Sequence, residues 1–455
     1  MRQKKQAAVL PEKLLFSRQA LNRLIWPLVG EQFLAVMTGM ADTVMVASAG
    51  ESAVSAVSLV DSINILMINI FSALAAGGAI VVSQYLGNRD EENADSAAKQ
   101  LVVVIGALST VLGLACAFTR GPLLGFLFGR VDAAVMTNAS KYFFITAFSY
   151  PFLAVYNAGA AIFRSMGNSR VSLRASLIAN GVNFAGNALC IYGLGWGVVG
   201  AAIPTLISRI VGAALILRML QNPGLQITLT DWKHFRLQLP MVRRILGIGI
   251  PNGLENGMFQ VGKILVQSLI ATFGTASIAA NAVSNTLCTL PQIPAQGVGL
   301  AMTTVVGQCV GAGDYPQASH YIKKLTGIAF GCNFVLCIAF YLGAPLTVLP
   351  FALTAGTAAM TLRISRTYYL VCMAIWVLSF TFPNGLRAAG DVRFTMSASM
   401  ISMWVFRIGF SYLLAQYLGM GIFGVWYAMY IDWIVRVLSF VARYASGRWK
   451  TKRVI

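Results

Sequence analysis

Long apolar runs alternate with short polar segments along the chain, and this pattern predicts a membrane protein built from helices. A hydrocarbon core about 30 Å thick is crossed by about 20 apolar residues of helix. Twelve runs reach this length, so we expect an all-α protein with twelve transmembrane helices. The expected spans are 24–48, 53–86, 98–118, 138–161, 172–193, 197–218, 245–271, 277–310, 321–343, 362–386, 395–417 and 421–443.

The chain repeats part of its own sequence at a constant offset of 224 positions. The matched residues are Pro27, Glu31, Gly50, Val81, Val82, Gln84, Gly87 and Asp90, which recur as Pro251, Glu255, Gly274, Val305, Val306, Gln308, Gly311 and Asp314. The sharpest match sets VVSQYLGNRD against VVGQCVGAGD. A further match, FRSMGNSR against LRAAGDVR, is displaced by 223 positions. Internal repeats of this size in an apolar chain are typical of transporters. Because six spans is an even number, the two halves should have the same orientation in the membrane.

Composition agrees with a bilayer environment, since 57% of the 455 residues are hydrophobic and only 11% are charged. Of the 34 Lys and Arg residues, 25 fall in the two termini, in the loops that follow even-numbered spans or within about three residues of them. This asymmetry predicts that both termini are cytoplasmic. The net charge of +19 is then explained by contact with anionic lipid headgroups, and we expect no binding of nucleic acid.

These patterns divide the chain into five expected parts. A cytoplasmic N-terminal segment occupies 1–23, and a first six-helix lobe occupies 24–218. The longest polar connection, 219–243, is expected to be a cytoplasmic linker. A second lobe occupies 244–443, and a basic cytoplasmic tail occupies 444–455. We expect no cleaved signal peptide and a multi-pass location in the inner (plasma) membrane.

A carboxylate inside hydrocarbon is costly and usually marks an ion or substrate path. Asp42 lies 18 residues beyond the start of the first span, about 27 Å along the helix at 1.5 Å per residue. The fifth span presents Asn180, Asn183 and Asn187 on one face, and the sixth span brings Thr205 to a similar depth. Carboxylate, amide and hydroxyl oxygens suit a proton or Na⁺ site. Simple helix packing by the amides is the alternative.

Other polar residues in the spans form a second tier of candidates. Glu31 and Glu255 each follow a proline by four residues near a helix start, where a structural role is as reasonable as a functional one. Lys263 lies deep in the seventh span, where it either pairs with Asp432 or helps to bind an anionic group. Salt bridges to Asp432 are also open to Arg407 and Arg436, and Arg436 is favoured because it lies one turn away.

Pro27 precedes Asp42 by fifteen residues in the first span. It either permits a bend of the helix or occupies a simple N-terminal helix position.

In its motifs and their order the chain resembles the multidrug and toxic compound extrusion (MATE) family, and is closer to the DinF-like branch. The P-x3-E openings of spans one and seven, the Q-x2-G turns after spans two and eight, and R-x2-G-x2-R after spans four and ten carry the resemblance. It implies a V-shaped transporter of two parallel lobes that exchanges organic compounds for protons or sodium ions. The family's ion-coupled site maps onto Asp42, Asn183, Asn187 and Thr205, with Asn187 standing where the family has an acid.

We therefore expect an antiporter, coupled to protons, that exports organic, often cationic, compounds by alternating access. Sodium coupling through the four mapped residues is the first alternative, and a flippase for a lipid-linked precursor of the wider superfamily is the second. Asn157 in the fourth span joins the candidate ion or substrate ligands. The expected partners are small lipophilic or cationic molecules and the bilayer, for a monomer that is not an enzyme and has no resident metal. No cofactor is expected beyond the coupling H⁺ or Na⁺, because the sequence shows two His and no phosphate-binding loop.

Overall fold

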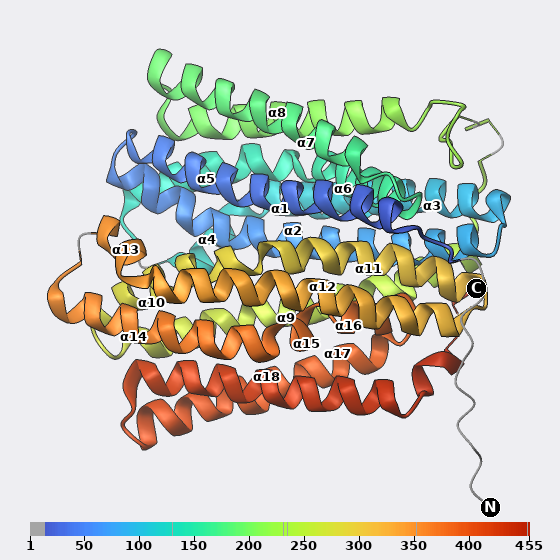
Figure 1. Ribbon diagram of the computed structural model, residues 1–455. Helices are drawn as coiled ribbons and strands as arrows, with labels where there is room; N and C mark the ends of the chain where they lie inside the picture. The colour runs from blue at the N-terminus through green and yellow to red at the C-terminus, as the bar shows by residue number, and fades with distance from the viewer. Residues whose placement is uncertain (1–13, 130, 231, 234, 352, 453) are drawn as a thin grey trace, which may run out of the picture. The chain divides into compact units, whose positions relative to one another are not determined.

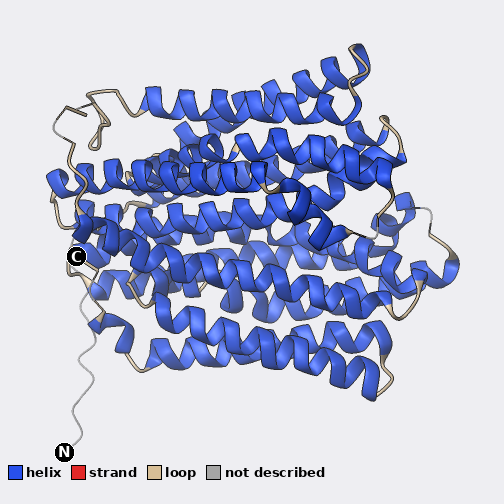
Figure 2. Ribbon diagram, turned by 180° about the vertical axis from the view of Figure 1, so that it is seen from behind, coloured by secondary structure: helices blue, strands red, loops and turns tan. Residues whose placement is uncertain are grey.

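Helices form almost all of the chain in the structure, a computed structural model, and its described residues contain no strand (Figures 1 and 2). The structure describes residues 14–129, 131–230, 232–233, 235–351, 353–452 and 454–455. Most of the expected N-terminal segment, 1–13, lies outside these ranges, as do positions 231 and 234 of the expected linker. The expectation of an all-α protein is confirmed.

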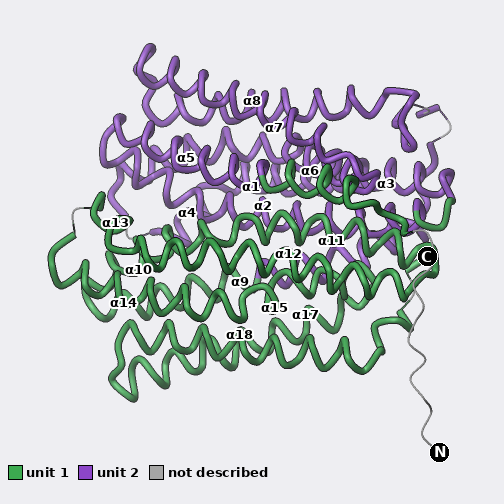
Figure 3. Tube along the Cα trace, in the orientation of Figure 1, with its two compact units in different colours: residues 1–29, 87–89, 258–455 green, residues 30–86, 90–257 purple. Residues whose placement is uncertain are grey.

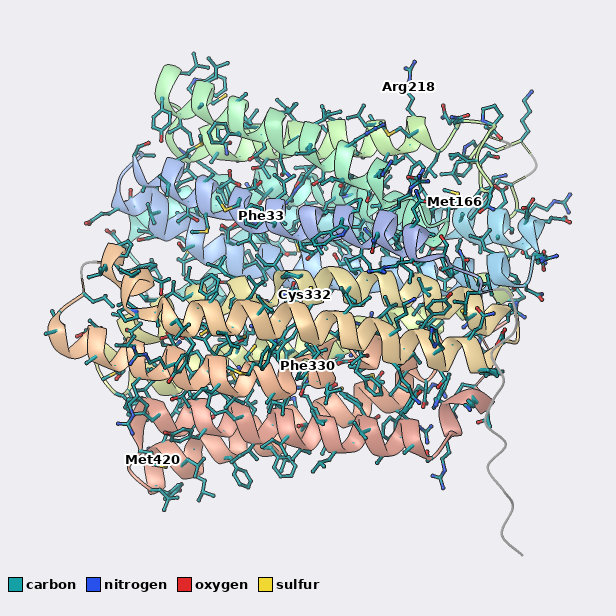
Figure 4. All side chains as sticks on the ribbon, in the orientation of Figure 1. Phe33, Met166, Arg218, Phe330, Cys332 and Met420 are labelled. Carbon is teal, nitrogen blue, oxygen red and sulfur yellow. The ribbon has the colours of Figure 1, made fainter. Side chains whose placement is uncertain are left out.

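The helices of the first half follow the expected spans closely. They are α1 (Arg18–Ala47), α2 (Glu51–Gly87), α3 (Glu91–Phe118), α4 (Arg120–Phe128), α5 (Ala133–Phe148), α6 (Tyr150–Ser165), α7 (Ser169–Asn187), which continues as a π-helical segment (Ala188–Gly193), and α8 (Gly197–Met219). Arg218, near the end of α8, is exposed and its side chain points away from the ribbon (Figure 4). Its position agrees with a basic, solvent-facing connection after the sixth span.

The helices of the second half are more often interrupted. They are α9 (Leu239–Ala271), α10 (Thr275–Thr289), α11 (Ile293–Gly311), α12 (Tyr315–Leu342), α13 (Ala344–Val348), α14 (Ala355–Val371), α15 (Val377–Phe380), α16 (Pro383–Ala388), α17 (Val392–Ile401) and α18 (Gly421–Ala445). A 3-10 turn joins α10 to α11, and π-helical segments join α14 to α15 and follow α17 at Ser402–Gly409 and Tyr412–Tyr417. Each expected span therefore corresponds to one helix or to a run of consecutive helical pieces.

Nine helices in the described ranges are long and apolar enough to cross a membrane, or ten when α5 and α6, bent by 44°, count as one span. The two expected spans that do not reach this standard are α7 with its π-helical continuation, and α9. Both carry polar side chains within the helix: α7 has three asparagines, and α9 has Glu255 and Lys263. These two spans thus carry five of the eleven candidate residues.

Two compact units make up the chain, and Figure 3 colours them separately. Unit 1 comprises Met1–Val29, Gly87–Arg89 and Met258–Ile455, and unit 2 comprises Gly30–Leu86 and Asp90–Gly257. These boundaries cross α1 and α9 within the helices, whereas the sequence places the lobe boundaries in loops. The expected lobe limits stay a prediction.

The sequence repeat is also a repeat of backbone conformation. Asp90 caps α3 by accepting a hydrogen bond from the Asn93 amide at 3.1 Å, and Asp314 caps α12 by accepting one from the Gln317 amide at 2.9 Å. Both residues end the matched decapeptides. The π-helical segments Ala188–Gly193 and Tyr412–Tyr417 are likewise displaced by 224 positions.

Hairpins after these π-helical segments repeat the same glycine conformation. Gly195 has φ +65° and Gly419 has φ +68°, the left-handed region that disfavours a Cβ atom. The repeated residues therefore specify caps and turns that build equivalent helix pairs in the two halves.

Loss of the Asp314 cap should destabilise the protein. Asp314→Ala removes the acceptor for the first amides of α12, which typically costs about 1 kcal/mol of folding free energy. Thermal denaturation of the purified protein should show a lower midpoint for Asp314→Ala. Asp314→Asn is the matched control, because an asparagine side chain also caps a helix. A midpoint for Asp314→Ala equal to that of the wild type would contradict the assigned role of the cap.

Candidate functional site

A continuous chain of hydrogen bonds links four of the residues that the sequence singled out, all within unit 2. The Asn187 Nδ2 group donates to Asp42 Oδ1 at 2.8 Å and to Asn183 Oδ1 at 3.3 Å. The Asn183 Nδ2 group in turn donates to Thr205 Oγ1 at 3.2 Å. Helices α1, α7 and α8 thus bring the predicted carboxylate, amides and hydroxyl together.

Close packing of α7 on α8 places this chain of hydrogen bonds. Gly186 makes the approach possible, because a Cβ atom at this position would lie 2.7 Å from the Pro204 Cβ atom. Small residues at such contacts let transmembrane helices approach closely. The approach buries Asn187, which is 1% exposed, beside Asn183.

One acceptor in the site has no partner among the described residues. The Asn187 Oδ1 atom is buried and accepts no hydrogen bond, while the Nδ2 group of the same amide makes two. A buried carbonyl oxygen without a partner carries a free-energy penalty. A proton on Asp42, after rotation of the amide, or a bound cation could satisfy Asn187 Oδ1.

A second carboxylate, Asp61 of α2, lies close enough to Asp42 to repel it electrostatically. Arg209 of α8 is also near, and it attracts both carboxylates. Asn64 Nδ2 donates to Asp61 Oδ1 at 3.1 Å, and Tyr142 Oη lies 3.5 Å from the same oxygen. Asp42 is therefore one of two carboxylates in this part of unit 2, and the Arg209 guanidinium lies near both.

Sequence reasoning missed Asp61 and Arg209, although both stand inside apolar runs. Asp61 lies in the expected span 53–86 and Arg209 in the expected span 197–218. The argument that singled out Asp42, the cost of a charge in hydrocarbon, applies equally to them. In the structure the Arg209 Nη1 group donates to Ser149 Oγ at 2.6 Å.

Two further predicted ligands do not join the chain of hydrogen bonds. Asn180 Nδ2 donates to Ser176 Oγ at 3.2 Å on its own helix, and Asn157 Nδ2 donates to Ser72 Oγ at 3.3 Å. Both amides are half-buried. The structure thus separates them from the Asp42 group.

The structure places Glu31, Glu255 and Pro27 inside the helices that the sequence predicts. Glu31 accepts a hydrogen bond from Ser172 Oγ at 3.0 Å and lies 3.7 Å from Arg164, which favours its structural interpretation. Glu255 is 8% exposed, and its side chain is largely removed from the surface. Pro27 stands inside α1, nine positions after the helix begins at Arg18, which excludes the N-terminal position and leaves the bend.

The predicted partners of Asp432 in unit 1 are found in part. The Asp432 carboxylate is buried and pairs with Arg436 at 2.9 Å, as the spacing of one helical turn predicted, and with Arg407 at 4.0 Å. Within the described part of the chain, Lys263 forms no ion pair with Asp432. Its ammonium instead lies 5.1 Å from the centroid of the Phe259 ring.

A family model described as MatE matches residues 27–189 and 251–413. The chain belongs to the MatE family. The two matched ranges differ by 224 positions, the same offset as the internal repeat. The expected resemblance to the multidrug and toxic compound extrusion family is confirmed, whereas the DinF-like branch stays a prediction.

Relatives in the MatE family cover almost the full chain. The uncharacterized transporter YisQ of Bacillus subtilis is 27% identical over 445 residues, which is 95% of each chain. The probable multidrug resistance protein NorM of Thermotoga maritima is 23% identical and covers 96% of this chain and 94% of its own. A solved structure of a multidrug resistance MATE family transporter in an outward-facing conformation has a TM-score of 0.87 at 21% identity, covering 96% of this chain and 97% of its own. The protein therefore has the fold of MatE transporters and is a multi-pass membrane protein.

Replacement of either site amide should change the pH dependence of transport. Asn187→Leu removes a donor from the ionised Asp42 carboxylate, and hydrogen bonds to charged groups are worth about 1.5–3 kcal/mol. Protonation then becomes easier, so the midpoint of the pH profile should move by about one to two units to higher pH. Asn183→Leu should move the midpoint less, because it acts through Asn187. Transport of a labelled organic cation in proteoliposomes at graded pH measures both shifts.

Asn180→Leu is the matched control for this measurement, since Asn180 lies on the same helix but bonds Ser176 rather than the Asp42 group. It should leave the pH profile unchanged. Lower thermal stability with an unaltered profile in Asn183→Leu and Asn187→Leu would assign the amides to helix packing.

Proposed function

We propose that this protein is a proton-coupled antiporter that exports organic, often cationic, compounds by alternating access. One observation carries the proposal: the Asp42 carboxylate, within a transmembrane helix, is held by a chain of amide and hydroxyl groups that does not neutralise it. An intramembrane carboxylate kept without full neutralisation is costly, and such groups mark ion and substrate paths. The names of the relatives, which describe transporters and multidrug resistance, support the same reading.

The charge balance of the site supports exchange. Asp42 and Asp61 are two negative charges, Arg209 is one positive charge, and the amides are neutral. One net negative charge remains when both acids are ionised. A single proton or a single organic cation neutralises it, whereas both together leave excess positive charge in a poorly solvated environment. Each ligand therefore weakens the binding of the other, which is the requirement for antiport.

Protons are favoured over sodium ions as the coupling ion. A sodium site requires several oxygen ligands, and an additional acid would raise its affinity, but Asn187 supplies an amide where the family has a carboxylate. The Asn187 Oδ1 atom, which has no partner in the described part of the chain, leaves one oxygen for a weakly bound Na⁺ beside Asp42, Asn183 and Thr205. Sodium coupling is therefore the second candidate.

Motion of α1 is the proposed link between the ion and access to the site. Proline removes a backbone donor from a helix and permits a bend. Pro27 lies in α1 on the same helix as Asp42, so protonation of the carboxylate and bending of the helix can be coupled.

The setting proposed for this activity is the plasma membrane. The basic residues gathered at the termini and at one set of loops favour both ends in the cytoplasm. Since the residues of the coupling site come from a single chain, the protein should act as a monomer on small lipophilic or cationic molecules taken from the cytoplasm or the bilayer.

Neutralising Asp42 should abolish coupled transport. Asp42→Asn keeps the shape of the side chain and can still bond Asn187, but it cannot bind and release a proton. In proteoliposomes, export of a labelled organic cation should follow an imposed proton gradient in the wild type and fall to the background rate in Asp42→Asn. A sodium gradient without a proton gradient should drive little transport in either protein.

Glu91→Gln is the control, because Glu91 is an exposed acid in the first turn of α3. It should transport at the wild-type rate. Proton-driven export by folded Asp42→Asn at the wild-type rate would remove Asp42 from the mechanism. If a sodium gradient but not a proton gradient drives export by the wild type, sodium would replace the proton as the coupling ion.

A further inference from the structure

Three cations in the transmembrane helices of unit 1 converge on one aromatic ring. The Lys263 ammonium lies 5.1 Å from the centroid of the Phe259 ring, the Arg407 guanidinium 5.3 Å and the Arg436 guanidinium 5.5 Å. These residues come from α9, from the π-helical segment Ser402–Gly409 and from α18. A cation over an aromatic face is attracted by the negative potential of the ring. Three positive charges around one ring nevertheless make this region of unit 1 strongly cationic.

The nearby carboxylate offsets only one of these charges. Asp432 Oδ1 accepts hydrogen bonds from Arg436 Nε at 2.9 Å and from Ser402 Oγ at 2.5 Å. Arg407 Nη1 reaches the other carboxylate oxygen at only 4.0 Å, and the Arg407 Nε group is buried with no hydrogen-bond partner among the described residues. Lys263 repels Arg407 and forms no ion pair within the described ranges. The cluster thus carries an excess of two positive charges.

The depth of the cluster makes this excess costly. Lys263 lies eight residues before the end of α9, about 12 Å along the helix, and Arg407 lies ten residues before the end of Tyr412–Tyr417, about 15 Å. Cations at such depth are expected to pair with an anion. Arg407 is largely buried. Lys263 is exposed as a residue, although its ammonium is largely removed from solvent, so the cluster is open on the Lys263 side.

The internal repeat relates this cluster to the Asp42 site of the first half. Arg407 stands 224 positions after Asn183, and Lys263 stands 224 positions after Gly39, one turn before Asp42. The position equivalent to Asp42 is Val266. The second half therefore uses the helices equivalent to those of the Asp42 site, with opposite charge.

We propose that Lys263 and Arg407 bind the carboxylate of a transported organic compound, whose apolar part packs near Phe259. The inference rests on the proposed export function and adds a substrate class, compounds with an acidic group, including zwitterions. Arg436 pairs with Asp432 and so does not bind the solute. Instead it positions the Asp432 carboxylate, which also lies near Arg407. An anionic lipid headgroup offers similar chemistry, but a headgroup bound at this cluster would lie unusually deep in the bilayer.

The test compares 1-naphthoate with its neutral analogue 1-naphthamide, by isothermal titration calorimetry on the purified full chain in detergent. The wild type should bind naphthoate at least about tenfold more tightly than naphthamide, since the charged pairs form only with naphthoate. Lys263→Gln and Arg407→Gln should each remove most of this preference. Arg407→Lys should restore part of it, because it keeps the charge but loses the planar fork of donors.

Lys324→Gln is the matched control, because the Lys324 ammonium also lies over an aromatic ring, that of Tyr321, at 6.0 Å. It should leave the naphthoate preference intact. Equal affinity for the two probes, or an undiminished preference in folded Lys263→Gln and Arg407→Gln, would overturn the proposal. Loss of naphthoate binding on adding phosphatidylglycerol to the detergent, with lipid binding that depends on Lys263, would also overturn it by assigning the cluster to lipid. The assay needs neither an ion gradient nor Asp42, so its failure is separate from a failure of proton-coupled export.

Discussion

The cost of holding a charge in hydrocarbon is the constraint on which both polar clusters depend. Bulk water is absent from the bilayer core, so a carboxylate or a cation there needs partners of opposite charge or a ligand. Among the described residues, Asp42 receives an amide hydrogen bond and shares the attraction of Arg209 with Asp61, and Lys263 receives a ring contact. In each cluster the residual charge identifies the ligand: a cation at Asp42 and an anion near Lys263.

The internal repeat explains how one backbone can serve two opposite charges. Helix caps at Asp90 and Asp314 and π-helical segments at Ala188–Gly193 and Tyr412–Tyr417 recur at the same offset. Conserving these features within the chain preserves the helix pairs of each half. The side chains that face the polar clusters are then free to differ, as Asn183 and Arg407 do.

Sequence reasoning located the Asp42 group because helix geometry is regular. A rise of about 1.5 Å per residue is enough to place Asp42, Asn187 and Thr205 at similar depths, and the i, i+4 spacing puts Asn183 and Asn187 on one face. The structure joins these residues by hydrogen bonds. Depth alone cannot show which faces of different helices turn toward one another, so Asn157 and Asn180 were included although they bond elsewhere.

The same limit explains what the sequence did not show in the rest of the molecule. The contact of Lys263 with Phe259 rather than with Asp432 depends on side-chain directions across three helices. The bend of 44° between α5 and α6 falls at Ser149, within an apolar run whose hydropathy does not mark it. Asp61 and Arg209, by contrast, were visible in the sequence as charges within the spans.

Competition between one proton and one organic cation is the central claim, and counting protons tests it most directly. The purified protein would be titrated with tetraphenylphosphonium in weakly buffered detergent solution containing a pH-sensitive dye, at a pH where the site is protonated. The account predicts release of about one proton for each cation bound, because the two ligands share one net negative charge. Stoichiometric binding of the cation with no proton released would contradict it.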